Sequence, residues 1–219
     1  MSINKDSRKY APATERNREP ILEVLKHVLP PHGTVLEVAS GTGEHAVFFA
    51  PRLSPRQWLP SDFDPQLRAS IAAWRNYQPT ENLYPPLELD ASASVWPVEA
   101  EALLELENNF DFDQYPLNAI VNINMIHISP WSTCLGLVAG AGRILPTGGI
   151  LYLYGPFKQG GKHTSQSNVA FDRALRSQNR GWGVRDLGDV VAAAQAQNLT
   201  FLQTYQMPAN NLSVVFQYQ

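Results

Sequence analysis

An acid and two glycines stand where the first apolar run of this sequence ends. Glu37 lies within the run from Thr34 to Ala39, and Gly41 and Gly43 follow in the turn that opens the next helical segment. Glycines let backbone N–H groups approach a ligand without a Cβ in the way, and parallel sheets bind ligands at the carboxyl ends of their strands. The spacing therefore predicts a turn that binds a nucleotide-type cofactor.

Two further acids follow the next apolar runs. Asp62 closes the second run and Asp90 the third. A carboxylate at the end of the second strand can accept hydrogen bonds from both hydroxyls of a ribose. Asp64 precedes Pro65 and is better explained as the cap of the next helix, so we assign the ribose role to Asp62. Three acids at three successive strand ends are hard to ascribe to turn chemistry alone.

The fourth apolar run carries polar side chains that a central strand does not normally have. Asn122 and Asn124 interrupt it, and His127 follows. Central parallel strands are usually apolar on both faces, so these side chains need partners. Asn124 and His127 lie towards the carboxyl edge and are predicted to line the reaction site. His127 is either a general base or cofactor contact, or a hydrogen-bonded structural histidine, and both interpretations stay open.

The elements that must position these residues alternate along the chain. Predicted strands cover 34–39, 57–60, 84–89, 119–126 and 150–154, and predicted helices cover 43–53, 65–76, 98–107 and 130–144. Such alternation is typical of a parallel sheet with helices on both faces. A helix starting near Asn17, with Pro20 in its first turn, precedes the sheet. A polar loop over 155–168 and helices over 169–179 and 186–198 follow it.

The chain ends with two apolar runs, 199–205 and 212–218, joined by a short connection. A parallel crossover needs about a dozen residues, so these two strands are predicted to pair antiparallel. The five parallel strands and this pair together predict an α/β, doubly wound sheet.

Composition excludes several function classes. The 219 residues fit one domain, 1–219, with 1–30 as an N-terminal helical segment. Apolar runs fall short of the ~20 residues of a membrane helix, and the polar N-terminus lacks a signal-peptide core, so a cytoplasmic protein away from membranes is expected. Cys134 is the only cysteine and the five histidines lack metal-ligand spacing, so no metal is predicted. The net charge of -3 gives no reason to expect a nucleic-acid partner.

Several stretches together resemble a known family. Glu37 opens the pattern Glu-x-Ala-x-Gly-x-Gly, which is similar to motif I of class I methyltransferases, with Ala39 in place of the first glycine. The chain resembles the methyltransferase-like twenty-six family, formerly a domain of unknown function, nearly end to end. The stretches that carry this resemblance are residues 10–22, 36–45, 122–128, 151–157, 171–172 and 182–186.

The resemblance implies a class I methyltransferase fold, with a seven-stranded sheet whose last strand is antiparallel, and S-adenosylmethionine as the cofactor. Its implied cofactor-binding residues are Glu37, Ala39, Gly41, Gly43, Asp62, Asp90, Asn124 and Arg16. Asp90 would bind the adenine amino group, and Arg16 would pair with the cofactor's carboxylate within a covering segment, residues 10–17. Asn124 and His127 would line the transfer region as catalytic residues.

Two other functions remain open from the sequence. The spacing from Gly41 to Gly43 and Ala46, with Asp62 about twenty residues on, also fits a loose dinucleotide fingerprint, as in a nicotinamide-dependent oxidoreductase. A non-catalytic protein that binds S-adenosylmethionine or acts as a scaffold is the third possibility. For a methyltransferase, the acceptor is a small molecule or a protein side chain that the sequence does not identify, and the oligomeric state is equally undetermined.

Overall fold

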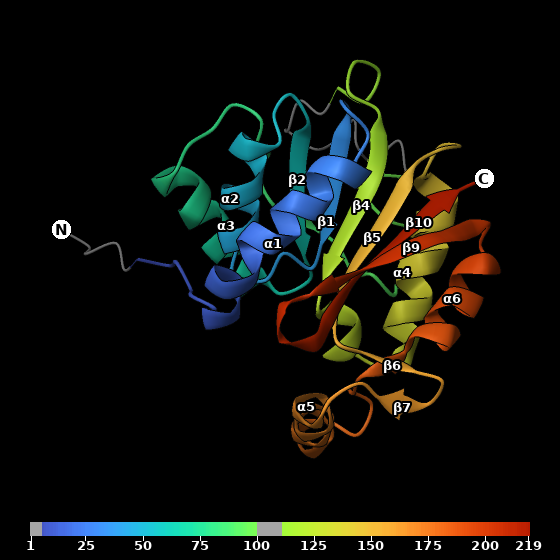
Figure 1. The fold of residues 1–219 in the computed structure, drawn as a ribbon. Helices are drawn as coiled ribbons and strands as arrows, with labels where there is room; N and C mark the ends of the chain where they lie inside the picture. Colours follow the sequence, from blue (N-terminus) through green and yellow to red (C-terminus); the bar gives the residue numbers. More distant parts are fainter. Residues whose placement is uncertain (1–5, 100–110) are drawn as a thin grey trace.

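The computed structural model describes residues 6–99 and 111–219, and a large sheet forms its centre (Figure 1). The strands of this sheet are β1 Thr34–Val38, β2 Gln57–Asp62, β3 Leu87–Glu88, β4 Leu117–Ile123, β5 Ile150–Gly155, β9 Leu199–Met207 and β10 Asn211–Tyr218. Within the described residues they form a seven-stranded sheet in the order β3-β2-β1-β4-β5-β10-β9. The first five are parallel, whereas β10 is antiparallel to both β5 and β9. The predicted α/β class and the antiparallel C-terminal pair are confirmed.

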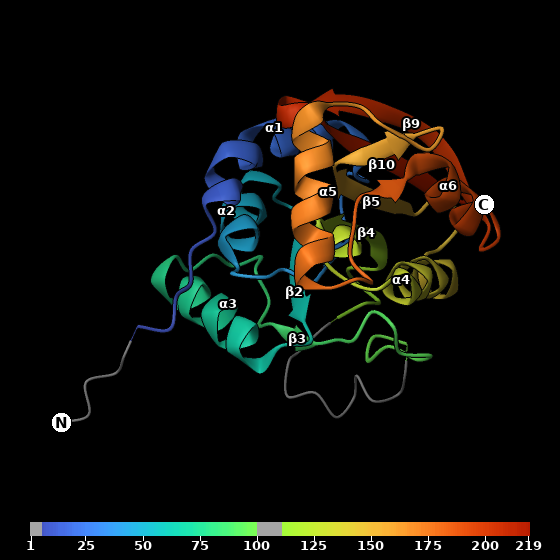
Figure 2. The same ribbon diagram turned by 90° about the horizontal axis from the view of Figure 1, so that it is seen from below.

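Helices cover both faces of the sheet (Figure 2). They are α1 Pro12–Val28, α2 Glu44–Arg52, α3 Pro65–Tyr77, α4 Trp131–Ile144, α5 Gln166–Gln178 and α6 Leu187–Gln195. Alternate residues of each strand face opposite sides. On β4, Ala119 and Val121 join the core under α1 and α2, whereas Ile120 joins the core under α4 and α6. Helix α5 lies beyond the carboxyl edge of the sheet rather than on a face (Figure 1).

Helix α1 begins well before the predicted start near Asn17. Pro12 is its first residue, and Ala11 ahead of it is extended. The prediction placed Pro20 in the first turn, because proline there loses no hydrogen bond. Pro12 occupies the first turn instead, and Pro20 lies inside the helix. The longer helix brings the buried side chains of Thr14 and Asn17 to the edge of the sheet.

Two strands are shorter than predicted. β3 comprises only Leu87–Glu88, because Pro85 and Pro86 have no N–H to donate to a strand ladder. β4 ends at Ile123, because Asn124 adopts a left-handed φ of 65°, which asparagine tolerates better than most residues. A single 3₁₀ turn, Met125–His127, follows. Met125 and Ile126, predicted as the end of the strand, lie in this turn together with His127.

The predicted polar loop over 155–168 contains regular structure. β6 Phe157–Gln159 and β7 Lys162–His163 form a hairpin, and β8 Arg185–Asp186 pairs with β6 to make a small three-stranded sheet. Gly160 and Gly161 form its turn, with φ values of 58° and 77° that favour glycine. The predicted helix over 98–107 lies outside the described residues from residue 100 onward.

Cys134 is fully buried in the core under α4, and burial raises the pKa of its thiol to about 12. It therefore packs as a small apolar side chain. In the described part of the chain, no helix combines the length and the apolar character needed to cross a bilayer.

Candidate functional site

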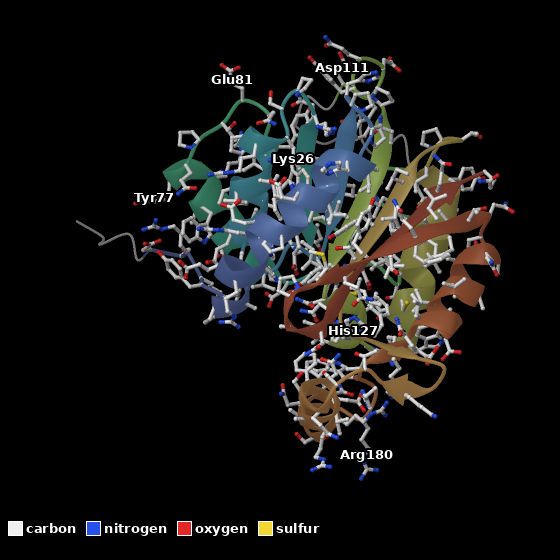
Figure 3. The ribbon with its side chains drawn as sticks, viewed as in Figure 1. Lys26, Tyr77, Glu81, Asp111, His127 and Arg180 are labelled. Atoms are coloured by element: carbon white, nitrogen blue, oxygen red, sulfur yellow. The ribbon has the colours of Figure 1, made fainter. Side chains whose placement is uncertain are left out.

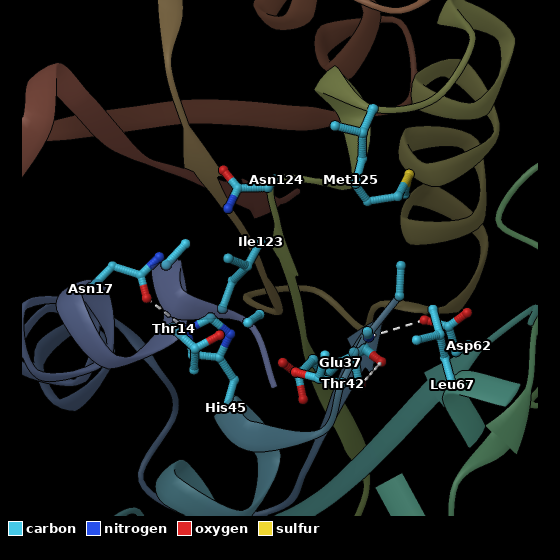
Figure 4. A pocket seen from close by; sticks show the side chains of 16 residues that line it. Thr14, Asn17, Glu37, Thr42, His45, Asp62, Leu67, Ile123, Asn124 and Met125 are labelled. Atoms are coloured by element: carbon cyan, nitrogen blue, oxygen red, sulfur yellow. Dashed lines mark hydrogen bonds between the residues drawn. The ribbon is translucent and has the colours of Figure 1, made fainter. Parts of the chain in front are cut away.

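A cavity of about 330 Å³ opens where β1, β2 and β4 end (Figure 4). Five residues named from the sequence line it: Glu37, Ala39, Gly41, Asp62 and Asn124. Its position at the carboxyl edge, between neighbouring strands of a doubly wound sheet, is where such folds bind ligands. Its volume falls within the roughly 300–1,000 Å³ of small-molecule sites. We refer to it as the first cavity.

Glu37 places a carboxyl group on the floor of the first cavity. It is only 1% exposed, and one carboxyl oxygen accepts a hydrogen bond of 2.9 Å from the indole N–H of Trp58. Burial raises the pKa of Glu37 to about 7, although the Trp58 bond acts in the opposite direction. A cationic group in the cavity would favour the ionised carboxylate. Glu37 is thus suited to bind a positively charged part of a ligand.

Asp62 lies at the opposite wall, where β2 ends, and holds the glycine turn. Its Oδ2 accepts a hydrogen bond of 3.0 Å from the Gly41 N–H, and its Oδ1 accepts one of 2.9 Å from the Asp64 N–H. Burial raises the pKa of Asp62, and these two backbone bonds oppose the rise. Each carboxylate oxygen can accept a second hydrogen bond, so Asp62 can bind a diol while still holding the turn.

Asp64 caps α3 and does not line the cavity. Its Oδ1 accepts a hydrogen bond of 2.7 Å from the Gln66 N–H, ahead of Pro65 at the first helical position. The cap predicted from the sequence is confirmed.

Asp64→Ala should therefore lower the free energy of unfolding by about 1 kcal/mol, the usual cost of losing an N-cap side chain. It should leave ligand binding in the first cavity unchanged. Urea unfolding gives the stability, and calorimetry with S-adenosylhomocysteine gives the binding. A variant with full stability but weaker binding would show that Asp64, and not Asp62, faces the ligand.

The two glycines of the turn have different roles. Gly41 lines the first cavity at a φ of 59°, and a Cβ at this position would meet no atom within 4 Å. Gly43 has a φ of 90°, and its Cβ would lie 2.7 Å from the Cα of Ile71 on α3. Gly41 thus leaves space for a ligand, whereas Gly43 allows α2 to start close against α3.

Ala39, just before the glycine turn, adopts a left-handed φ of 58°. An L-residue with a Cβ pays roughly 1–2 kcal/mol in this conformation. The class I methyltransferase pattern has glycine here, and the φ value gives the physical reason. Ala39 still lines the first cavity with its small side chain.

Asn17 and His45 line the first cavity and were not predicted from the sequence. The Oδ1 of Asn17 and the Nε2 of His45 are 2.8 Å apart, and Figure 4 shows this bond between α1 and α2. Burial lowers the pKa of His45 to about 3, with the charge of Arg18 as a second cause, so its ring is neutral. A polar residue on the apolar side of the predicted first helix, and a histidine directly after the glycine turn, were the available signals.

The segment before α1 is tied to the start of α2 and to α3. The Lys9 N–H donates to the Ser70 hydroxyl at 2.8 Å, and the Trp74 indole donates to the Lys9 carbonyl at 2.9 Å. The Ala11 N–H donates to the Glu44 carboxylate at 2.6 Å. These contacts fix the start of α1 beside the first cavity.

The first turn of α1 covers the first cavity, but not through the residues singled out in the sequence. Ala11, Ala13 and Thr14 line the cavity, and the helix has no side-chain cap. Tyr10 is 64% exposed and packs edge-on against Trp74 instead. The Thr14 N–H donates to the Ala11 carbonyl at 2.9 Å and Pro12 has no N–H, so the Ala13 N–H and the positive dipole end of this turn are what favour an anionic group of a ligand.

Arg16 lies at a neighbouring cavity of about 520 Å³, the second cavity. The two cavities share Ala13, Asn17, Asn124 and Ile128 in their linings. Arg16 lines only the second one, so its predicted pairing with the carboxylate of a ligand in the first cavity is not supported. Thr14 and Asn17, on either side of Arg16 in the helix, line the first cavity, so Arg16 points from a different side of α1.

His127 is buried behind β5 and lines neither cavity. It is 0% exposed, its ring packs edge-on against Phe157 at 5.0 Å, and its Nε2 has no hydrogen-bond partner among the described residues. Burial, and then the charge of Arg185, lower its pKa to about 3. Figure 3 shows it below the end of β4, beside the small sheet. Because the chain turns at Asn124, His127 lies outside the linings of both cavities, as expected of a structural histidine, and its general-base role stays a prediction.

Asp90 also lies away from the first cavity. Its Oδ1 accepts hydrogen bonds from the N–H and the hydroxyl of Ser92, at 2.8 Å and 2.7 Å. These bonds form a local turn directly after β3, which is the turn chemistry that the sequence left open for an isolated strand-end aspartate. The predicted contact with an adenine amino group has no support in the lining of the first cavity.

Several solved methyltransferases have a similar fold. The S-adenosylmethionine-dependent methyltransferase SibL, in its apo form, matches with a TM-score of 0.72 at 14% identity over 94% of this chain and 55% of SibL. An O-methyltransferase family protein from Burkholderia thailandensis matches with a TM-score of 0.71 at 12% identity, over 94% of this chain and 57% of that one. Human N-acetylserotonin methyltransferase in complex with S-adenosylmethionine matches with a TM-score of 0.70 at 13% identity, over 94% of this chain and 52% of that one.

This chain thus spans little more than half the length of these proteins, and at such identities the likeness shows the fold alone.

A protein-family model matches residues 8–218, which is almost the whole chain. The chain therefore belongs to this family, which is described as a protein of unknown function, DUF938.

Proposed function

We propose that this protein is an S-adenosylmethionine-dependent methyltransferase that binds the cofactor in the first cavity. One observation carries the proposal: the first cavity joins two buried carboxyl groups, Glu37 and Asp62, to a glycine turn with open space beside Gly41. S-adenosylmethionine carries a ribose diol, an ammonium and a carboxylate. The donors and acceptors of the cavity match each of them.

The fit is residue by residue. Asp62 would accept hydrogen bonds from the ribose hydroxyls at the end of β2. Glu37 would face the ammonium group, which favours its ionised form. The positive end of α1, with the Ala13 N–H, would face the carboxylate, a role that the sequence assigned to Arg16.

The bound cofactor supplies a methyl group on a sulfonium, which an acceptor nucleophile attacks in line. The contribution of the chain is positioning, which supplies much of the rate enhancement in such transfers. Asn17, Asn124 and Ile128 line both cavities, so a methyl group in the first cavity and an acceptor in the second would meet beside them. Asn124 is thereby proposed as a residue of the transfer site.

Ligand binding separates this function from its rivals. We expect S-adenosylhomocysteine and S-adenosylmethionine to raise the melting temperature, because a ligand that prefers the native state stabilises it. NADH and NADPH should not. Stabilisation by the nicotinamide cofactors alone would favour the oxidoreductase, and absence of heat with S-adenosylhomocysteine in a folded sample would refute the proposal. Binding without transfer to any acceptor would favour the scaffold.

Asp62→Ala should weaken S-adenosylhomocysteine binding by about 1.5 to 3 kcal/mol, the cost of losing a charged hydrogen-bond acceptor. This corresponds to a roughly ten- to 150-fold higher Kd by calorimetry. Asp64→Ala, at the exposed cap two residues on, is the matched control. If the two variants bound the ligand equally well, Asp62 would not be the ribose acceptor.

The family described above does not by itself establish the narrower resemblance to the methyltransferase-like twenty-six family, which stays a prediction. The single-domain organisation, the cytoplasmic location and the absence of a nucleic-acid partner also remain predictions.

A further inference from the structure

The second cavity lies beside the proposed cofactor site and has an apolar wall with one cationic side chain. Its volume of about 520 Å³ suits a small molecule. Ile128 and Phe171 in its lining are 44% and 40% exposed, and Pro156 and Pro208 extend the apolar surface. Large apolar side chains left open to solvent around a cavity indicate an apolar ligand.

Arg16 is the charged residue of this lining. It is exposed, and no described carboxylate lies within ion-pair distance of its guanidinium. A guanidinium without a partner beside an apolar cavity favours an anionic group, above all a carboxylate, which it can bind through two parallel hydrogen bonds. It disfavours an ammonium group. The ligand chemistry is therefore an apolar body with an acidic group.

Amide groups at the boundary of the two cavities add hydrogen-bond donors. The Oδ1 of Asn17 is engaged by His45, and its amide group, on the side of Asn124 in Figure 4, also hydrogen-bonds with Tyr154 and keeps one N–H for a ligand. Asn124 makes no side-chain hydrogen bond with a described residue. Both amides can donate to an anionic oxygen placed between the cavities.

A proton acceptor is missing from the described lining of the second cavity, which contains no aspartate, glutamate, histidine, lysine or cysteine. Arg16 and Tyr154 are the ionisable side chains of this described lining. Burial raises the pKa of the Tyr154 hydroxyl, so it stays protonated. Glu37, His45 and Asp62 face the first cavity, and His127 is buried behind Gly155. A neutral hydroxyl acceptor would have to lose a proton that no group here is placed to take.

We propose that the methyl acceptor is a small apolar carboxylic acid, bound as its carboxylate in the second cavity by Arg16. This inference rests on the proposed methyltransferase function. The carboxylate oxygen donates a lone pair to the methyl carbon, the carbon–sulfur bond breaks, and its electron pair stays on sulfur. The products are a methyl ester and neutral S-adenosylhomocysteine, and no proton is transferred.

The test compares matched acids and amides on the protein saturated with S-adenosylhomocysteine. The probes are phenylacetate, cinnamate and octanoate, with their primary amides and with octylamine, and ligand-observed NMR gives the Kd. At least one acid should bind roughly ten- to hundredfold more tightly than its amide, the usual range for a charge-assisted contact. Octylamine should bind most weakly.

Arg16→Gln should raise the Kd of the acid to that of its amide and leave S-adenosylhomocysteine binding unchanged, because Arg16 does not line the first cavity. Arg173→Gln, an exposed arginine on α5 outside the cavity, is the matched control and should change nothing. Phe171→Ala should weaken the acid and the amide alike, since it removes apolar contact.

Acids that bind no better than amides, or unchanged acid binding in Arg16→Gln, would overturn the inference while S-adenosylhomocysteine binding keeps the proposed function intact. Failure of S-adenosylhomocysteine to bind would overturn both. Where an acid binds, incubation with S-adenosylmethionine should release its methyl ester, detected by mass spectrometry. A bound acid that is never esterified would show that the second cavity is not the acceptor site.

Discussion

Gly43→Ala should lower the free energy of unfolding by about 2 to 5 kcal/mol. A left-handed φ costs an L-residue roughly 1–2 kcal/mol, and overpacking a rigid contact costs about 1–3 kcal/mol. Both apply here, because φ is 90° and the new Cβ would lie 2.7 Å from the Cα of Ile71, which cannot rotate away. Urea unfolding followed by circular dichroism measures the loss.

Gly41→Ala is the matched control, two residues earlier in the same turn. Its φ of 59° carries the same conformational cost, but its Cβ would meet no atom within 4 Å. We expect a loss of only about 1–2 kcal/mol. The same Cβ would project beside the first cavity and weaken S-adenosylhomocysteine binding. Equal stability losses in the two variants would contradict the division of roles between ligand approach and helix packing.

Glu37→Gln should change how stability depends on pH. Burial raises the pKa of Glu37 to about 7 in the folded chain, from an ordinary value of 4.5. Between these values the folded state binds a proton that the unfolded state has lost, so Glu37 makes stability fall as pH rises. Below pH 4.5 its contribution is fully present, and above about pH 7 it is lost. Between these two pH limits the contribution of Glu37 to the free energy of unfolding falls by about 3 kcal/mol.

The measurement is the free energy of unfolding of the native protein minus that of Glu37→Gln, from pH 4 to pH 8 in urea. Glutamine retains the acceptor oxygen for the Trp58 indole, so the variant keeps the buried hydrogen bond. The pKa values of His45 and His127 are lowered to about 3, so these two residues make stability rise with pH. Both proteins contain them, so their effect cancels in the difference. A difference that stays constant between pH 4.5 and 7 would refute the raised pKa.

Elements whose patterns are local were predictable from the sequence. Alternating apolar runs and helical segments indicated the doubly wound sheet, because each element must bury its own face whatever its neighbours are. The short connection before Asn211 determined the antiparallel pair of β9 and β10. Asp64 before Pro65 determined a cap, since capping needs only adjacent residues. Glu37, Gly41 and Asp62 meet at one cavity because parallel strands end at the same edge.

Contacts between distant segments were decided only by the tertiary structure. The left-handed turn at Asn124 buries His127 behind β5, and no local pattern distinguishes that outcome from a catalytic position. The packing of α1 against α2 pairs Asn17 with His45, and Arg16 lies at the second cavity. A side chain's burial, its partners and its pKa depend on which surfaces pack together, and those surfaces are assembled from residues far apart in the chain.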